Sequence, residues 1–129
     1  MIDHTGLQVT DPKKSRNFYD KALAPLGYQM LKEIPKEFTN GKVNLGYGIS
    51  PKADFWVKEG VANTPRLHIA FTADTHAQVD EFYKAAMAAG GTDNGAPGPR
   101  PHYNKDYYGA FVLDPDGHNI EAVCHKPAL

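Results

Sequence analysis

The chain has 129 residues, of which 41% are hydrophobic and 22% charged, a composition that suits one folded domain and excludes a disordered chain. Fourteen basic and fifteen acidic residues give a net charge of −1, so no positive excess is available for nucleic-acid binding. No apolar run approaches the roughly 20 residues of a membrane span. The first residues, 1–4, show no signal peptide, and the single cysteine, Cys124, excludes an internal disulfide. We therefore expect a cytoplasmic protein that binds neither nucleic acid nor membrane.

The sequence contains an internal repeat with a spacing of 64 residues. When residues 1–61 are aligned with residues 65–125, nine of the 61 pairs are identical. They include His4/His68, Phe18/Phe82, Gly27/Gly91 and Pro51/Pro115. These pairs fall at matching points of one pattern of strands and helix that occurs twice. We expect a single domain, residues 1–129, built from two modules that cover about 1–61 and 65–125.

The first half begins with a short predicted strand at His4–Val9. Asp11 followed by Pro12 is typical of a helix start, because aspartate caps free amide groups and proline suits the first turn. Apolar residues then recur at helical spacing until Gly27 ends the helix. The rest of this half predicts three strands, at 28–33, 43–49 and 54–58.

The second half repeats this order, with a strand at Leu67–Phe71 and a helix that Asp74 and Thr75 cap. The helix has the most regular apolar spacing in the chain, with Val79, Phe82, Tyr83, Ala86 and Met87 on one side. The second strand of this half falls in a Gly/Pro-rich loop, 90–101. Two further strands, 107–113 and 118–125, are joined by the Asp-Pro-Asp-Gly turn at 114–117. Both halves predict a β-α-β-β-β module, and the fold class is therefore α+β.

Three residues that can bind a metal share one face of the predicted strands. Because side chains alternate along a strand, His4, His68 and Glu121 fall on the face turned away from the helices. Two imidazoles and a carboxylate suit a divalent metal, and they bind it only when the imidazoles are neutral, above about pH 6. The 64-residue repeat places Val57 at the position equivalent to Glu121, and valine cannot coordinate. The expected site is therefore open to water or substrate, as catalytic metal sites are.

Residues in and beside the late loop are candidates for catalysis. His102 and Tyr107 are the predicted catalytic groups, since either side chain can transfer a proton. Tyr103 is predicted to bind substrate, because a tyrosine ring stacks on aromatic compounds. Tyr107 and Tyr108 have opposite parity, so at most one of them enters the cleft.

Other residues are predicted to line the cleft. Arg66 shares a side of its strand with His68 and could hold a carboxylate or phosphate group of the substrate. Phe55 and Val57 are expected to form an apolar wall opposite Asn119 and Glu121. Trp56 has the opposite parity and is expected to pack in the core.

The sequence resembles the vicinal oxygen chelate superfamily of glyoxalases, bleomycin-resistance proteins and extradiol dioxygenases. The resemblance lies in Ile2-Asp3-His4, in the Leu67–Phe71 strand and above all in Phe111–Glu121, which contains Asp-Pro-Asp-Gly; residues 91–124 are similar to glyoxalase-like bacterial proteins. It implies a curved, incompletely closed eight-stranded sheet with a metal at its floor, held by His4, His68 and Glu121. It also implies a homodimer, and it leaves open whether the ligands come from one chain or from both chains through swapped modules.

The leading hypothesis is a metal-dependent enzyme that acts on a small molecule with neighbouring oxygen atoms, as a lyase, dioxygenase or transferase. The residues do not choose among Fe²⁺, Mn²⁺, Zn²⁺ and Ni²⁺ for its one divalent ion. One alternative is a metal-free protein that binds a drug or metabolite, like the bleomycin-resistance proteins. Another is a member of the superfamily that has kept the residues and lost turnover.

Overall fold

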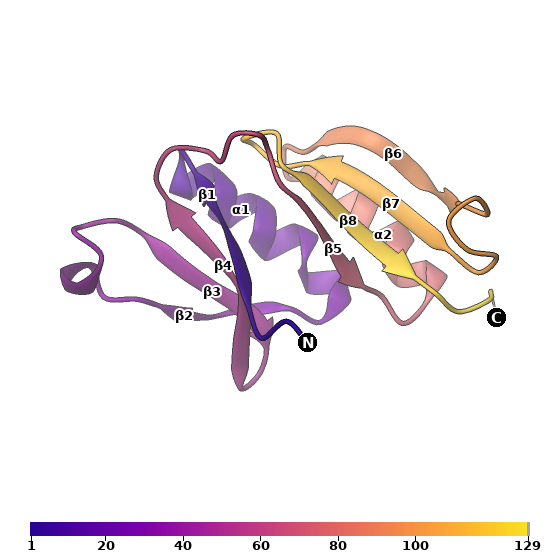
Figure 1. Cartoon of the computed structure of the whole chain (residues 1–129), viewed down its shortest axis with the longest axis horizontal. Coiled ribbons are helices and arrows are strands. Elements are labelled where there is room, and N and C mark those ends of the chain that lie inside the picture. The colour runs from indigo at the N-terminus through magenta and orange to yellow at the C-terminus, as the bar shows by residue number, and fades with distance from the viewer. Residues whose placement is uncertain (129) are drawn as a thin grey trace.

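The computed structural model describes residues 1–128 and consists of two modules with the same order of elements (Figure 1). The first contains β1 (Thr5–Val9), α1 (Pro12–Ala22), the short 3-10 helix η1 (Ala24–Leu26), β2 (Gln29–Glu33), a second 3-10 helix η2 (Lys36–Phe38), β3 (Asn44–Ile49) and β4 (Lys52–Glu59). The second contains β5 (His68–Thr72), α2 (His76–Ala88), β6 (Thr92–Pro99), β7 (Tyr108–Leu113) and β8 (Asn119–Cys124). The predicted pair of βαβββ modules is confirmed. Among the described residues no helix is long and apolar enough to span a membrane.

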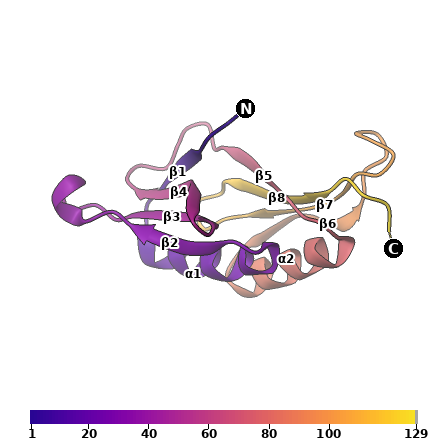
Figure 2. The same cartoon turned by 90° about the horizontal axis from the view of Figure 1, so that it is seen from below.

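The eight strands form two separate four-stranded sheets that do not close into a barrel. Their orders are β1-β4-β3-β2 and β5-β8-β7-β6. In each sheet the first and last strands of the module pair in parallel, and the other neighbours are antiparallel. Figure 2 shows both helices on the same side of the sheets. One face of each sheet is therefore left without a helix, and β1 and β5 lie at sheet edges.

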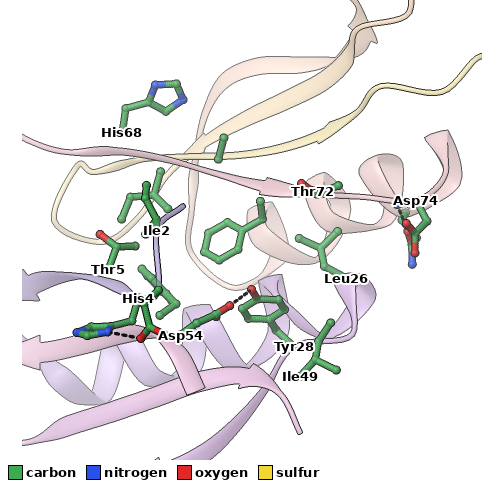
Figure 3. Close-up of a pocket in the computed structure, with 16 residues that line it drawn as sticks. Ile2, His4, Thr5, Leu26, Tyr28, Ile49, Asp54, His68, Thr72 and Asp74 are labelled. Atoms are coloured by element: carbon green, nitrogen blue, oxygen red, sulfur yellow. Dashed lines mark hydrogen bonds and ion pairs between the residues drawn. The ribbon is translucent and has the colours of Figure 1, made fainter. Parts of the chain in front are cut away.

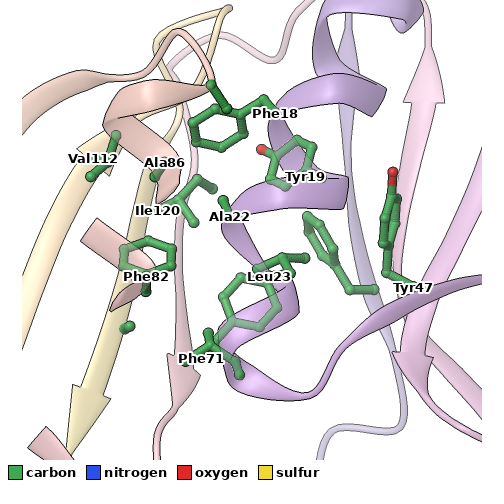
Figure 4. Close-up of a cluster of buried hydrophobic side chains, with 14 of the residues drawn as sticks. Phe18, Tyr19, Ala22, Leu23, Tyr47, Phe71, Phe82, Ala86, Val112 and Ile120 are labelled. Atoms are coloured by element: carbon green, nitrogen blue, oxygen red, sulfur yellow. The ribbon is translucent and has the colours of Figure 1, made fainter. Parts of the chain in front are cut away.

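The hydrophobic core lies where the two helices meet the sheets and each other (Figure 4). The helices begin as predicted, because the Asp11 side chain accepts from the amides of Lys13 and Lys14 and Thr75 accepts from Gln78. Each helix then buries one apolar side. The buried apolar helix residues are Phe18, Tyr19, Ala22, Val79, Phe82 and Ala86.

The Gly/Pro-rich segment 90–101, in which the second strand of the second half was expected, contains the edge strand β6. Its pairing with β7 shifts register twice, between Asp93 and Gly95 and again between Gly95 and Gly98. Gly95 has a positive φ of 150°, which few other residues adopt. Prolines are tolerated here because an edge strand has one unpaired side. The many glycines and prolines of this segment are typical of a loop, and they fit this strand because its pairing is irregular.

The Asp-Pro-Asp-Gly turn joins the two modules. The Asp114 carboxylate is buried, and it accepts a hydrogen bond of 2.6 Å from the Tyr19 hydroxyl of α1 and another from the His118 amide. The buried His118 ring accepts from the Leu67 amide at 3.0 Å and donates to the Gln8 carbonyl at 2.9 Å. The second module is thus hydrogen-bonded to both α1 and β1.

Replacing Tyr19 by phenylalanine is expected to destabilise the fold by about 1–3 kcal/mol near neutral pH, because Asp114 would lose a donor while staying buried. Burial already raises the pKa of Asp114, and loss of the Tyr19 bond would raise it further. The cost arises from the ionised carboxylate, so it should shrink as the pH falls through the pKa of Asp114. Urea unfolding at two pH values measures both effects.

Tyr108→Phe is the matched control. It removes a similar tyrosine–aspartate bond, 2.7 Å to Asp80, at an exposed carboxylate. We expect a cost of about 1 kcal/mol or less. Equal losses of unfolding free energy in the two variants would show that the buried Tyr19–Asp114 hydrogen bond contributes no more than the exposed Tyr108–Asp80 bond.

Candidate functional site

A histidine, a glutamate and a tyrosine meet on the helix-free face of the second sheet. Nε2 of His68, from β5, lies 2.8 Å from Oε1 of Glu121, from β8. The Tyr107 hydroxyl donates to the other carboxylate oxygen, Oε2. Glu121 is only 1% exposed although it faces away from the helices, because these neighbours cover it. Both oxygens of a buried carboxylate are therefore held in place.

The two adjacent tyrosines point in opposite directions, as predicted. Tyr107 contacts Glu121, and burial together with that carboxylate raises the pKa of Tyr107 well above its usual value. Tyr108 lies on the helix side, stacked on His76 with ring centroids 4.0 Å apart. Its hydrogen bond to Asp80 raises the pKa of Tyr108 to about 12. Of the two tyrosines, only Tyr107 lies on the helix-free face that carries Glu121.

The other candidates from the late loop lie further from Glu121. Tyr103 packs against Tyr107 with a centroid separation of 5.0 Å, and its ring is largely exposed. His102 is exposed and contacts Tyr103 at 4.2 Å, so two rings separate it from Glu121. His125, which the sequence did not single out, packs on Tyr107 at 5.2 Å. The catalytic role of His102 and the substrate contact of Tyr103 stay predictions.

His4 does not join His68 and Glu121 within one chain. Its Nδ1 lies 2.8 Å from the Asp3 carboxylate, which also pairs with Lys52. Figure 3 shows that the His4 and His68 rings lie apart and that neither points toward the other. Within residues 1–128 no three histidine, cysteine or acidic side chains gather closely enough to hold a metal. The chain by itself assembles two of the three predicted ligands.

The first module departs from the sequence prediction by one residue. Gly6 pairs with Trp56, whereas the equivalent Ala70 pairs with Glu121, so the repeat spacing on these last strands is 65 and not 64. Trp56, not Val57, occupies the position equivalent to Glu121.

The predicted orientations around this position are therefore wrong. Phe55 and Val57 are each 1% exposed and pack in the hydrophobic core, so they do not share the helix-free face with the position equivalent to Glu121. Phe55 also lines the cavity between the modules, and its predicted contact with substrate stays a prediction. Trp56, expected in the core, lies instead on the helix-free face, over Gly46.

The predicted contact of Arg66 with substrate stays a prediction, and a second arginine, Arg100, lies over Phe111, the strand partner of Glu121. Arg66 donates to the Asp116 and Asn63 carbonyls and so braces the linker between the modules. Arg100 lies over the Phe111 ring, 5.5 Å from its centroid, and Phe111 in turn lies 6.1 Å from His68. Sequence reasoning missed Arg100 because it follows the irregular strand β6.

Asn119 pairs in register with His68 and accepts a hydrogen bond from Asn94. Its predicted contact with substrate stays a prediction.

A cavity of about 720 Å³ lies between the two modules (Figure 3). It is lined by both modules, including Ile2, His4, Leu26, Tyr28, Ile49, Asp54, Phe55, His68 and Phe71. The Tyr28 hydroxyl donates to one Asp54 oxygen at 3.1 Å, and the other oxygen is buried without a partner. The same bond and burial raise the pKa of Tyr28 to about 12. This cavity is separate from the Glu121–Tyr107 contact, although His68 borders both.

Comparison with known proteins gives one family. The family model described as the glyoxalase/bleomycin resistance protein/dioxygenase superfamily matches residues 1–122. A glyoxalase/bleomycin resistance protein from Albidiferax ferrireducens is 28% identical, with a TM-score of 0.72, and the match covers 95% of this chain and 97% of that one. No curated protein matches the chain.

Two more distant solved structures share the fold. Glyoxalase I from Zea mays is 21% identical, with a TM-score of 0.68, over 98% of this chain and 44% of the maize chain. This chain therefore spans less than half the length of the plant enzyme. The fosfomycin resistance protein FosX from Listeria monocytogenes, in complex with Mn(II) and a dihydroxypropylphosphonic acid, is 20% identical, with a TM-score of 0.67, over 95% of this chain and 87% of that one.

Proposed function

Because the chain belongs to the glyoxalase/bleomycin resistance protein/dioxygenase superfamily, we propose that it is a metal-dependent enzyme of the glyoxalase or dioxygenase type. Its substrate would be a small molecule with two neighbouring oxygen atoms. The observation that supports this proposal best is the contact of His68 with Glu121, whose second oxygen is fixed by Tyr107. A divalent metal is common in this superfamily, and FosX holds Mn(II).

The donor set fits a divalent metal if two copies of the chain share the site. His68 and Glu121 supply one nitrogen and one oxygen ligand from neighbouring strands. His4 is exposed on the other module, so a second copy can supply it where the same chain does not. The free edges of β1 and β5 are consistent with a homodimer, since unpaired strand edges are usually covered. In this arrangement each dimer has two equivalent sites.

Tyr107 acts in this proposal as a positioning residue. Burial and the Glu121 carboxylate raise the pKa of Tyr107, and its hydroxyl donates a hydrogen bond to Glu121. That bond holds Oε2 and leaves Oε1 to bind the metal beside His68. A bound divalent ion supplies Lewis acidity toward the two substrate oxygens. Trp56 replaces a fourth ligand and leaves coordination positions for the substrate.

The shared site is tested by combining two inactive chains. His4→Ala and His68→Ala are each expected to lose metal, measured by elemental mass spectrometry. When the two variants are co-expressed equally, half of the dimers contain both, and each mixed dimer has one intact site. We therefore expect metal to return to about one quarter of the wild-type content.

The two single variants and their mixture distinguish the alternatives. No recovery in the mixture would place all ligands within one chain. Full metal content in His4→Ala would remove His4 from the ligand set. Sedimentation measurements on the same samples check that the variants still dimerise.

Tyr107→Phe is expected to weaken Mn²⁺ binding roughly 10–100-fold, because Glu121 would lose the group that orients it. Tyr108→Phe is the control, since the hydroxyl of Tyr108 bonds to Asp80 on the other side of the strand. Calorimetric titration with Mn²⁺ measures both affinities. Equal affinities for the wild type and Tyr107→Phe would contradict the positioning role.

A metal-free binding protein is the second candidate, and the cavity between the modules favours it. A volume of about 720 Å³ and apolar walls such as Ile2, Leu26 and Ile49 suit a drug-sized ligand. Under this alternative, bleomycin should bind the EDTA-treated protein with low-micromolar affinity, and calorimetry can measure it. Absence of binding under these conditions would leave the metal enzyme as the better account.

A further inference from the structure

We propose that Asn94 is a site of spontaneous covalent modification, at which the folded chain converts this asparagine into aspartate and isoaspartate. The attacking group is the backbone nitrogen of Gly95. This inference is independent of the proposed function, because it requires neither a metal nor a second copy of the chain. It is carried by the interrupted pairing of β6 with β7 and by the exposed side chain that binds the Gly95 amide.

The reaction is a ring closure within one Asn-Gly pair. The Gly95 nitrogen forms a bond to Cγ of Asn94, the Cγ–Nδ2 bond breaks, and the Gly95 amide proton leaves with Nδ2 as part of ammonia. The succinimide ring that remains is opened by water. Attack of water at Cγ gives aspartate, whereas attack at the main-chain carbonyl gives isoaspartate, in which the backbone runs through the side chain. Glycine favours ring closure because it has no Cβ to obstruct the approach.

The backbone around Asn94 is less constrained than that of a regular strand. The register of β6 with β7 shifts between Asp93, which pairs with Val112, and Gly95, which pairs with Phe111, so Asn94 lies in a bulge. Asn94 is exposed, and Gly95 has a φ of 150°. The Gly95 amide donates to Oδ1 of the exposed Asp93 side chain at 2.9 Å. Exchange of this side-chain bond with water frees the attacking nitrogen.

The chain contains a second Asn-Gly pair, Asn40–Gly41, which provides an internal comparison. It lies in the turn between η2 and β3, where Asn40 has a φ of 57°. There the Gly41 amide donates to the Lys36 carbonyl at 2.9 Å. Because this bond joins two backbone atoms within a closed turn, the nitrogen of Gly41 is held more firmly than that of Gly95. Asn94 is therefore the faster of the two sites.

Modification of Asn94 changes the surroundings of His68. The Asn94 amide nitrogen donates to Oδ1 of Asn119 at 3.2 Å, and Asn119 is in register with His68 on the neighbouring strand. A carboxylate can only accept hydrogen bonds, so Asn119 would have to turn its amide and become the donor. One negative charge is also added to the helix-free face, where alternation along β8 places Asn119 with Glu121.

The test follows both Asn-Gly pairs in the full chain during incubation at mildly alkaline pH. Peptide mapping by mass spectrometry separates each asparagine from its products, and enzymatic methylation detects isoaspartate. In the folded chain we expect Asn94 to convert roughly two- to tenfold faster than Asn40, the effect of one backbone hydrogen bond on a rate. In urea the two pairs should convert at similar rates, because the same residue follows each asparagine and the structural difference is lost.

Two variants complete the experiment, and thermal unfolding confirms that each is folded. Asp93→Ala should raise the rate at Asn94 and leave the rate at Asn40 unchanged, because it removes the side chain that holds the Gly95 amide. Asn94→Gln should yield no product in this segment, because the longer side chain closes a ring far more slowly. Equal rates at the two pairs in the folded chain, a faster reaction at Asn40, or an Asp93→Ala variant with an unchanged rate at Asn94 would each overturn the proposal.

Discussion

The buried carboxylate of Asp114 is the group on which the arrangement of the two modules depends. It accepts hydrogen bonds from Tyr19 and from the amides of Asp116 and His118. Burial raises the pKa of this carboxyl, while its donors favour the charged form and oppose that rise. A buried charge with fewer donors would be costly. Because Tyr19 belongs to the first module and the turn to the second, the carboxylate is satisfied at one relative orientation only.

That orientation determines which surfaces remain available for chemistry. With both helices on one side, each sheet keeps an open face and two edge strands. His4 lies on one module, and His68 with Glu121 lies on the other, without meeting it. In the homodimer that we propose, a twofold axis would bring the first module of one copy to the second module of its partner and repeat the contact. Ligands that lie apart within one chain could in this way form one site between two chains.

The sequence predicted side-chain orientation well in one module and badly in the other, for a local reason. In the second module the Asp114–Gly117 turn sets the start of β8, so the orientation of Glu121 followed from alternation. Ten residues separate Gly46 from Trp56 in the first module and Phe111 from Glu121 in the second, so the two hairpins match at this position. The one-residue difference arises earlier, between β1 and β3, because 40 residues separate Gly6 from Gly46 and 41 separate Ala70 from Phe111. No residue type marks this irregularity, and the contact between modules that separates His4 from His68 cannot be read from either repeat alone.

The two modules carry different side chains, Glu121 and Trp56, at one equivalent strand position. Glu121 is surrounded by larger partners, Ala70 and Phe111, which help to bury it and to hold it against His68. Trp56 has glycine on both sides, and its side chain is partly buried. The side chain and its neighbours therefore differ together, because a tryptophan between Ala70 and Phe111 would lack space and a glutamate between two glycines would lack cover.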